Sequence, residues 1–187
     1  MNICLFCASR SDVDQSFHDA AAELGKGIAE GADVLYYGGG SVGLMGTCAR
    51  AVHAHGGRVV GVIPSRLRDR EIAYEAADEL IVTATMSDRK RILLDESDGF
   101  VILPGGFGTL DELLDAVTTK QLGYHDKPIV IVNVAGFFDA QFEMFRSIVW
   151  RGFADSGQLA LFETTTDVIS ALRILRASTT QEAADDR

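Results

Sequence analysis

Short apolar segments alternate with longer amphipathic segments along almost the whole chain, and no other feature constrains the fold as strongly. The apolar segments are predicted strands, at residues 2–8, 33–37, 58–63, 79–82, 99–103 and 128–132. The amphipathic segments are predicted helices, at residues 13–30, 44–55, 87–96, 110–122, 138–151 and 167–176. Continuously apolar strands that alternate with helices indicate a parallel sheet covered on both faces. The sequence therefore predicts a doubly wound, Rossmann-like α/β fold.

The length of the chain fits a single domain. A chain of 187 residues, 47% of them hydrophobic, can bury one sizeable core and has little left for a second. No internal repeat or linker divides the sequence, so we predict one domain over residues 1–176. Residues 177–187 are polar and are predicted to form a frayed or disordered tail.

The charge of the chain restricts its partners. A formal net charge of −10 argues against nucleic acid or an anionic membrane surface, because both require a basic face. No apolar run approaches the roughly 18–20 residues of a membrane span, and the N-terminus lacks the pattern of a signal peptide. We therefore expect a cytoplasmic protein whose partner is a small molecule. An anionic small molecule would need strong hydrogen-bond donors at its binding site to overcome the net negative charge of the chain.

The cysteines and histidines do not predict a metal site. Cys4 and Cys7 form a C-x-x-C motif, but residues three apart on a strand point to opposite faces of the sheet. We interpret both as ordinary buried residues, and three scattered cysteines agree with a reducing compartment. The four histidines also lack ligand spacing, so neither a metal nor a cofactor is expected. They are His18, His53, His55 and His125.

The first glycine-rich turn, residues 38–46, contains G-x-G-x-x-G between a predicted strand and a predicted helix. In dinucleotide-binding folds this pattern follows the first strand, whereas here it follows the second, and no acidic residue ends the next strand. Two interpretations stay open: a bend that brings helix and strand close together, or a wall of a substrate site. Arg66 and Arg68 suit an NADP phosphate, which leaves an NADP-binding oxidoreductase as a rival function.

The second glycine-rich turn, residues 103–112, carries the strongest local signal. It closes a predicted strand and opens a predicted helix, with glycines at Gly105, Gly106 and Gly108. Glycines can present their N–H groups without obstruction by a Cβ atom, and the helix dipole places partial positive charge beside them. This turn therefore predicts a site for an anion such as a phosphate group.

Glu112 has two interpretations. The pattern Thr109-x-x-Glu112 is a possible capping box, in which both side chains bond free N–H groups of the first helical turn. Alternatively, a carboxylate one turn below a phosphate site points towards the sugar of the same ligand, and the neighbouring glycines favour this interpretation.

A basic cluster at residues 86–91 opens the helix after the fourth predicted strand. It lies at the carboxyl edge of the sheet, where open α/β folds bind their ligands. A charge run is most often a solvated helix face, and we expect that for Arg91. For Arg89 we predict a ligand contact, because it lies at the same edge of the sheet as the predicted phosphate site at residues 103–112.

Six segments together strongly resemble the Lonely Guy (LOG) family, and the resemblance extends from residue 2 to about residue 175. They are F-C-A-S at 6–9, Y-G-G-G-S-V-G-L-M-G at 37–46, G-V-I-P at 61–64, M-S-D-R-K at 86–90, P-G-G-F-G-T-L-D-E at 104–112 and Q-L-G-Y-H-D-K-P at 121–128. The most specific part is the R-K dipeptide followed, at the expected spacing, by P-G-G-x-G-T-x-x-E.

This resemblance implies a cytokinin riboside 5′-monophosphate phosphoribohydrolase. Such an enzyme hydrolyses the N-glycosidic bond of a purine nucleoside 5′-monophosphate and releases the free base and ribose 5-phosphate. The resemblance implies catalytic roles for Arg89 and Glu112, no metal, and a homodimer. With the two local patterns above, it gives an expected set of substrate-binding residues. These are Glu71, Met86, Lys90, Gly105, Gly106, Phe107, Gly108, Thr109, Leu110, Asp111 and Thr118.

The chain departs from the family pattern at two places. Ser87 and Asp88 precede R-K, where the family usually has His and then Glu or Gln, and Thr119-Lys120 stands where a Trp usually follows the helix threonine. Neither departure removes a presumed catalytic group. Related P-G-G-x-G-T proteins include a molybdenum-cofactor carrier that binds without catalysing. A noncatalytic nucleotide or molybdenum-cofactor carrier is therefore the alternative function.

Overall fold

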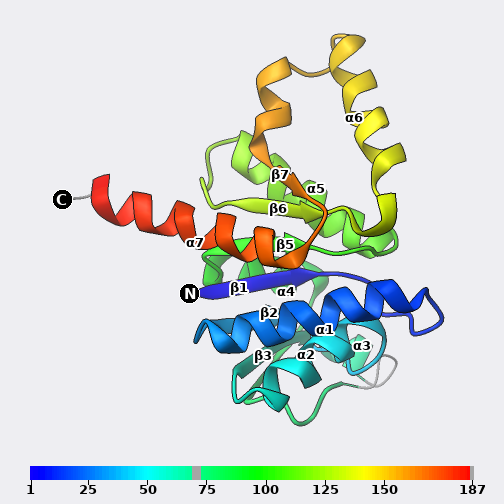
Figure 1. The fold of residues 1–187 in the computed structure, drawn as a ribbon, viewed down its shortest axis with the longest axis vertical. Coiled ribbons are helices and arrows are strands. Elements are labelled where there is room, and N and C mark those ends of the chain that lie inside the picture. Colours follow the sequence, from blue (N-terminus) through cyan, green and yellow to red (C-terminus); the bar gives the residue numbers. More distant parts are fainter. Residues whose placement is uncertain (69–72, 186–187) are drawn as a thin grey trace.

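The computed structural model describes residues 1–68 and 73–185, and within them the chain forms one parallel sheet (Figure 1). The strand order is β4-β3-β2-β1-β5-β6-β7. The strands are β1 (Asn2–Phe6), β2 (Val34–Tyr37), β3 (Arg58–Pro64), β4 (Glu79–Thr83), β5 (Gly99–Ile102), β6 (Ile129–Val132) and β7 (Glu163–Thr165). Each neighbouring pair is parallel, which confirms the predicted doubly wound fold.

Helices cover both faces of the sheet (Figure 1). They are α1 (Gln15–Glu30), α2 (Gly43–Ala54), α3 (Ser65–Arg68), α4 (Met86–Glu96), α5 (Phe107–Gln121), α6 (Asp139–Trp150) and α7 (Val168–Asp185), with 3₁₀ turns η1 (Val134–Gly136) and η2 (Ser156–Leu161). Helices α1, α2 and α7 pack on one face, and α4 and α5 pack on the other. Among the described residues, no helix has both the length and the apolar character needed to cross a membrane.

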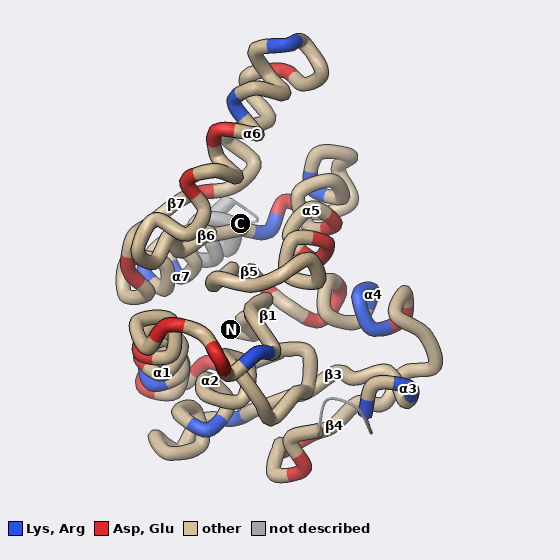
Figure 2. The backbone as a smooth tube through the Cα atoms, turned by 90° about the vertical axis from the view of Figure 1, so that its right-hand side faces the viewer, with Lys and Arg blue, Asp and Glu red and all other residues tan. Residues whose placement is uncertain are grey.

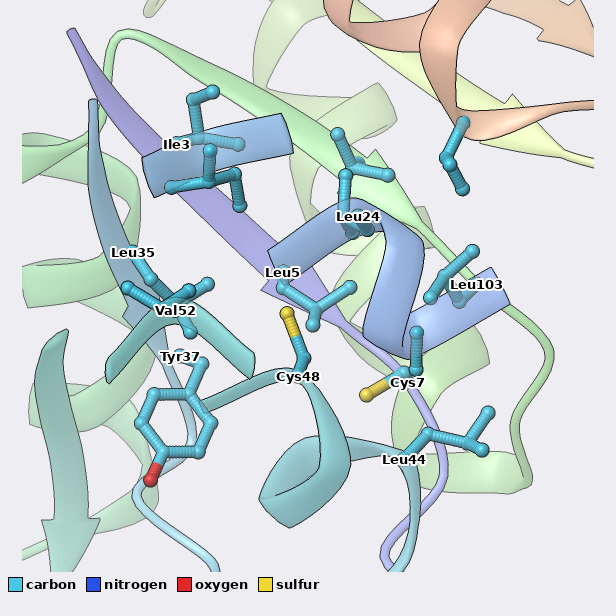
Figure 3. Packing of buried hydrophobic residues seen from close by; sticks show 14 of the residues in the cluster. Ile3, Leu5, Cys7, Leu24, Leu35, Tyr37, Leu44, Cys48, Val52 and Leu103 are labelled. Atoms are coloured by element: carbon cyan, nitrogen blue, oxygen red, sulfur yellow. The ribbon is translucent and has the colours of Figure 1, made fainter. Parts of the chain in front are cut away.

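Two hydrophobic cores flank the sheet, and residues near β1 contribute to both. Cys7 packs with Leu24, Leu44 and Cys48 in the core beneath α1 and α2 (Figure 3). Cys4 packs in the opposite core, beneath α4 and α5. The two thiols therefore lie on opposite faces of the sheet, which confirms the interpretation of the C-x-x-C motif as two buried core residues.

Two predicted element boundaries are wrong at the C-terminal end of the chain. Strand β7 was not expected, because it is a short polar strand at the sheet edge that pairs only with β6 and has no apolar signature. Helix α7 continues to Asp185 instead of ending at Arg176, since residues 177–185 include Ala, Gln and Glu, which favour helix. A frayed or disordered tail over residues 177–187 stays a prediction.

The sheet topology places a ligand site at its centre. From β1 the chain proceeds through β2, β3 and β4 on one side, and then through β5, β6 and β7 on the other. The strand order thus reverses between β1 and β5, and in open α/β sheets ligands bind outside the carboxyl ends of the strands at such a point.

Candidate active site

A cavity of about 460 Å³ opens at the carboxyl ends of β1 and β5, where the strand order reverses. Its walls come from the loop after β1, the N-termini of α2 and α4, and the turn that opens α5. The lining residues are Cys7, Ala8, Ser9, Arg10, Val13, Phe17, Leu44, Met45, Met86, Arg89, Pro104, Gly105, Gly106, Phe107, Gly108, Thr109, Asp111, Glu112 and Phe137. The cavity therefore gathers most of the residues singled out in the sequence.

The N-terminus of α5 forms the polar end of this cavity. Its N-cap residue is Gly106, which has no side chain to bond the first N–H groups of the helix. These N–H groups have no acceptor within the helix, and the helix dipole adds partial positive charge. Because Gly106, Gly108 and Thr109 line the cavity, the helix end is suited to hold a phosphate group.

The glycines of this turn have different roles. A Cβ atom on Gly105 would overlap the Thr109 side chain, so close packing excludes any larger residue there. A Cβ atom on Gly106 or Gly108 would meet no atom within 4 Å, so at these positions a side chain would occupy free space along the cavity. The predicted unobstructed backbone is therefore present at Gly106 and Gly108, whereas Gly105 is a packing requirement.

The capping box considered for Thr109 and Glu112 is not formed. Helix α5 begins at Phe107, three positions before the predicted start at residue 110, so both residues lie inside the helix. The predicted boundary is wrong because the Phe-Gly pair, which reads as part of the turn, is the first part of the helix. Glu112 is consequently not needed for capping, and its carboxylate is available for other contacts.

Glu112 forms a buried ion pair with Arg89. The Arg89 Nη2 atom of α4 lies 2.9 Å from the Glu112 Oε1 atom of α5, and the two residues are only 7% and 8% exposed. Arg89 Nη1 lies 3.8 Å from the Met86 sulfur. Among the described residues, Arg89 Nε is buried without an acceptor. The pair thus places a carboxylate and a donor group on the cavity wall.

Lys90 does not line this cavity itself but pairs with two carboxylates of α5, one of which, Asp111, lines the cavity. Its Nζ atom lies 2.8 Å from the Asp111 carboxylate and 3.8 Å from that of Asp115. Burial acts to lower the pKa of Lys90, but the bond to Asp111 and the neighbouring carboxylates outweigh it, so the pKa is raised. Figure 2 shows the basic segment of α4 opposite the acidic segment of α5. The R-K dipeptide therefore joins α4 to α5 through two separate ion pairs.

The remaining predicted contacts lie at different places. Leu110 packs against the core beneath α4 and α5, and Thr118 is exposed on α5; neither lines the cavity. Glu71 lies outside the described residues. Arg91 pairs with Asp95 on the exposed face of α4, as expected for a solvated side chain.

The first glycine-rich turn does not form an anion site. The Leu44 N–H group donates to the Ala8 carbonyl oxygen at 3.0 Å, and the Gly43 N–H group donates to Ser11 Oγ at 3.1 Å. The N-terminus of α2 is thus satisfied within the chain, which argues against a dinucleotide pyrophosphate there. In the NADP interpretation Arg68 was a phosphate ligand, but it pairs with Glu75 at 3.0 Å.

Both open interpretations of this first turn hold in part. Gly43 has a φ of 63°, and a Cβ atom there would lie 2.5 Å from the Ser9 backbone, so the glycine allows a close bend. Leu44 and Met45, which follow it on α2, contribute side chains to the cavity wall.

An apolar wall of the cavity consists of Val13 and Phe17 near the start of α1, Leu44 of α2, and Phe137 before α6. Of these four, only Leu44 lies in a segment for which the sequence suggested a substrate-lining role, and the other three were not predicted. The rings of Phe17 and Phe137 meet edge to face with centroids 5.7 Å apart. Arg10 and Ser9 were also missed. No local motif marks these residues, because only the fold brings their separate segments together.

Comparisons with known proteins agree with the resemblance in the sequence. Residues 45–175 match the model of a family described as possible lysine decarboxylase. The chain is 41% identical to the cytokinin riboside 5′-monophosphate phosphoribohydrolase LOG2 of Arabidopsis thaliana, over 92% of this chain and 81% of that protein. It is 40% identical to the probable cytokinin riboside 5′-monophosphate phosphoribohydrolase LOGL9 of Oryza sativa subsp. japonica, over 92% and 76%.

A solved structure shares the fold. The molybdenum cofactor carrier protein of Chlamydomonas reinhardtii superposes with a TM-score of 0.72 at 28% identity, over 94% of this chain and 98% of that one. The plant relatives are more similar in sequence, and the family model covers more than half of the chain. The chain therefore belongs to the LOG family.

Proposed function

We propose that this protein is an N-glycosidase. Its substrates are the 5′-monophosphates of purine nucleosides, either AMP or nucleotides with an N6-substituted adenine, and its products are the free base and ribose 5-phosphate. The observation that carries this proposal is the buried Arg89–Glu112 pair in a cavity that also contains the uncapped N-terminus of α5. The activity named for the LOG relatives supports the same reaction.

The N-terminus of α5 holds the 5′-phosphate in this proposal. The N–H groups at Gly106, Phe107 and Gly108 are its donors, and the buried Thr109 side chain lies beside them. Binding of the phosphate fixes the sugar at a distance from the reacting bond, so phosphate binding energy is converted into correct orientation at C1′. The predicted contacts of Glu71, Lys90, Leu110 and Thr118 are not needed for this step and stay predictions.

Glu112 acts at the ribose. Cleavage of the bond between C1′ and the base nitrogen leaves its electron pair with the base and produces an oxocarbenium-like sugar. The Glu112 carboxylate stabilises this positive charge and orients a water molecule. The water oxygen then bonds to C1′, one water proton passes through Glu112 to solvent, and the departing base takes up a proton. Arg89 holds the carboxylate in place, and its side chain lines the cavity beside the ligand.

The apolar wall receives the base. With the phosphate at α5 and the ribose beside Glu112, the wall of Val13, Phe17, Leu44 and Phe137 provides an apolar part of the cavity for the base. Its side chains suit a flat purine and an apolar N6 substituent, as does the partly exposed Met86.

The functional protein is a cytoplasmic homodimer in this proposal. Large apolar side chains are exposed at the end of α5 (Leu122 and Tyr124) and at the end of α6 (Trp150 and Phe153), and an interface between two copies would bury them. Three buried cysteines without disulfide bonds agree with a reducing compartment.

One assay tests the activity. The protein is incubated with AMP, isopentenyladenosine monophosphate and adenosine in parallel, and the free base is measured by chromatography. We expect base from the two nucleotides and at least roughly 10²-fold less from adenosine, which lacks the phosphate anchor. Tight nucleotide binding without base release would contradict the hydrolase and favour a carrier. Equal turnover of adenosine and AMP would contradict the phosphate site.

A further inference from the structure

The glycines of the first glycine-rich turn have no role in the proposed chemistry so far. The N-terminal donors of α2 are used within the chain, so the turn binds no anion through them. Gly39 and Gly43 have positive φ values, which explains why glycine stands at these two positions. Gly38 has no positive φ, so its backbone conformation is open to other residues and its need for glycine has another cause.

The space that a Gly38 side chain would fill is occupied by Arg89. A Cβ atom built on Gly38 would overlap Arg89 Nη2 and would lie 3.2 Å from Arg89 Cζ and 3.2 Å from the Met45 sulfur. The guanidinium of α4 therefore lies directly against the end of β2. This contact connects the two glycine-rich turns of the sequence through one arginine side chain.

The atom that meets Gly38 is the atom that pairs with Glu112. Arg89 Nη2 lies 2.9 Å from Glu112 Oε1, while Nη1 lies against the Met86 sulfur. Gly38, Glu112 and Met86 thus surround the guanidinium on three sides. A methyl group at Gly38 would force Arg89 Nη2 to move. The ion pair between Nη2 and Glu112 Oε1 would then be broken or change its geometry.

We propose that Gly38 is a positioning residue for the reaction: its missing side chain leaves the slot that holds the Arg89 guanidinium against Glu112. This inference rests on the proposed function, in which Arg89 and Glu112 touch the substrate. The overlapping atom is the end of a flexible side chain, so Gly38→Ala is accommodated by moving Arg89 and not the backbone. The substitution therefore damages the site more than the fold.

Two glycines elsewhere provide matched controls for Gly38→Ala. A Cβ atom on Gly25 of α1 would overlap the Cys48 backbone carbonyl of α2, so Gly25→Ala disturbs helix packing without touching Arg89. A Cβ atom on Gly157 of η2 would meet no atom within 4 Å, so Gly157→Ala tests the substitution alone. We expect Gly25→Ala to lower Tm and to leave kcat of the folded protein near the parent value, and Gly157→Ala to change neither.

The kinetic test uses AMP hydrolysis below the Tm of every variant. We expect Gly38→Ala to lower kcat by roughly 10²-fold, the effect of a misplacement of about 1 Å, while KM changes by less than about 3-fold because the α5 contacts remain. In an Arg89→Ala background, Gly38→Ala should lower kcat by less than about 2-fold further. An equal effect of Gly38→Ala in both backgrounds would overturn the proposal.

A crystal structure of Gly38→Ala separates this proposal from the proposed function. We expect Nη2 to lie beyond hydrogen-bond distance from Glu112 Oε1. If the parent releases no base from any nucleotide, the proposed function fails. A displaced Arg89 guanidinium in the Gly38→Ala structure would even then support the positioning role of Gly38. If the guanidinium keeps its contact with Glu112, the slot is refuted, whatever the activity of the variant.

Discussion

Arg89 and Glu112 neutralise each other on the cavity wall, with Nη2 and Oε1 2.9 Å apart and both side chains more than nine-tenths buried. Each comes from a different helix, so the pair joins α4 to α5, and in the proposed function it also forms the reactive part of the site. Removing one charge leaves the other buried and unpaired, which costs more free energy than the pair contributes. Substitutions at either residue therefore affect both rate and stability.

Glu112→Gln should lower kcat by roughly 10²- to 10⁴-fold, the range for losing a positioned acid–base group. The amide keeps the shape of the side chain but cannot stabilise the ribosyl cation. KM for AMP should change less, since the phosphate contacts remain. We also expect a loss of about 1–3 kcal/mol in the free energy of unfolding, because the Arg89 charge loses its partner.

The control for this substitution is the neutral pair made by Arg89→Gln with Glu112→Gln. Tm of the double variant should exceed that of Glu112→Gln alone, while kcat stays low. Steady-state kinetics at a temperature where each variant is folded, together with thermal unfolding, measures both. Normal turnover by Glu112→Gln would remove Glu112 from the mechanism.

Gly106→Asp should raise KM for AMP by roughly 10- to 100-fold, which corresponds to about 1.4–2.8 kcal/mol. An aspartate at this N-cap position bonds the same N–H groups as the phosphate and repels it. The added Cβ atom meets no neighbour, and aspartate is a good N-cap, so Tm should stay equal or rise slightly. The helix would thus gain stability while the site loses affinity.

Gly106→Asn is the matched control, because it caps the helix without adding a charge. Its KM should lie between those of the parent and Gly106→Asp. If all three proteins have the same KM for AMP, the N-terminus of α5 does not hold the phosphate.

Phe137→Ala should reduce the preference for an N6-isopentenyl substituent. We expect kcat/KM for isopentenyladenosine monophosphate to fall by roughly 5- to 30-fold, since loss of the ring contact removes about 1–2 kcal/mol. AMP, which lacks the substituent, should change by less than about 3-fold. Phe153→Ala serves as control, because Phe153 is exposed and does not line the cavity. Parallel losses for both nucleotides would contradict a substituent-specific role.

Asp78 makes stability depend on pH. Its Oδ2 atom accepts a bond from the Val59 N–H group at 2.8 Å and lies 2.9 Å from His53 Nε2. These two contacts, the Val59 bond first, hold the pKa of Asp78 below its usual value. A carboxyl group with a lowered pKa stabilises the fold above its unfolded pKa of about 3.9 and loses this contribution as pH falls through the folded pKa.

The measurement compares Tm of the parent and Asp78→Asn across pH. The parent should be the more stable at pH 5, and the difference should shrink as the pH falls from 5 towards 3. A difference that grows between pH 5 and pH 3 would contradict this assignment.

The central strands were predictable from the sequence because each is a run of buried apolar residues. Residues such as Val60, Ile102 and Ile131 have no polar alternation, which is typical of a parallel sheet covered on both faces. The exposed edge strand β7 lacks this signal, since Glu163 and Thr165 pair through their backbones only. Backbone pairing does not depend on side-chain type, so a short polar strand leaves little trace in the sequence.

The polar end of the site was predictable, but its apolar wall was not. Gly106 and Glu112 lie in one local motif, whose meaning depends on a helix N-terminus a few residues away. Phe17 and Phe137 are separated by more than a hundred positions and meet only because α1 begins and η1 ends at the same sheet edge. Such a contact depends on topology, which local periodicity does not encode. The contact between Gly38 and the Arg89 guanidinium was not predictable for the same reason.

Cys7, a buried residue that also lines the cavity, provides a reporter that does not require turnover. Burial, followed by the neighbouring Cys48 and Glu112, raises the pKa of this thiol, so it remains protonated and reacts slowly with free alkylating reagents at neutral pH. A nucleotide analogue that carries a mild electrophile would be held beside it and would label Cys7 ahead of Cys4 and Cys48, which are buried outside the cavity. Mass spectrometry of the labelled peptide would then measure occupancy of the site, and the same chemistry provides a starting point for a covalent inhibitor.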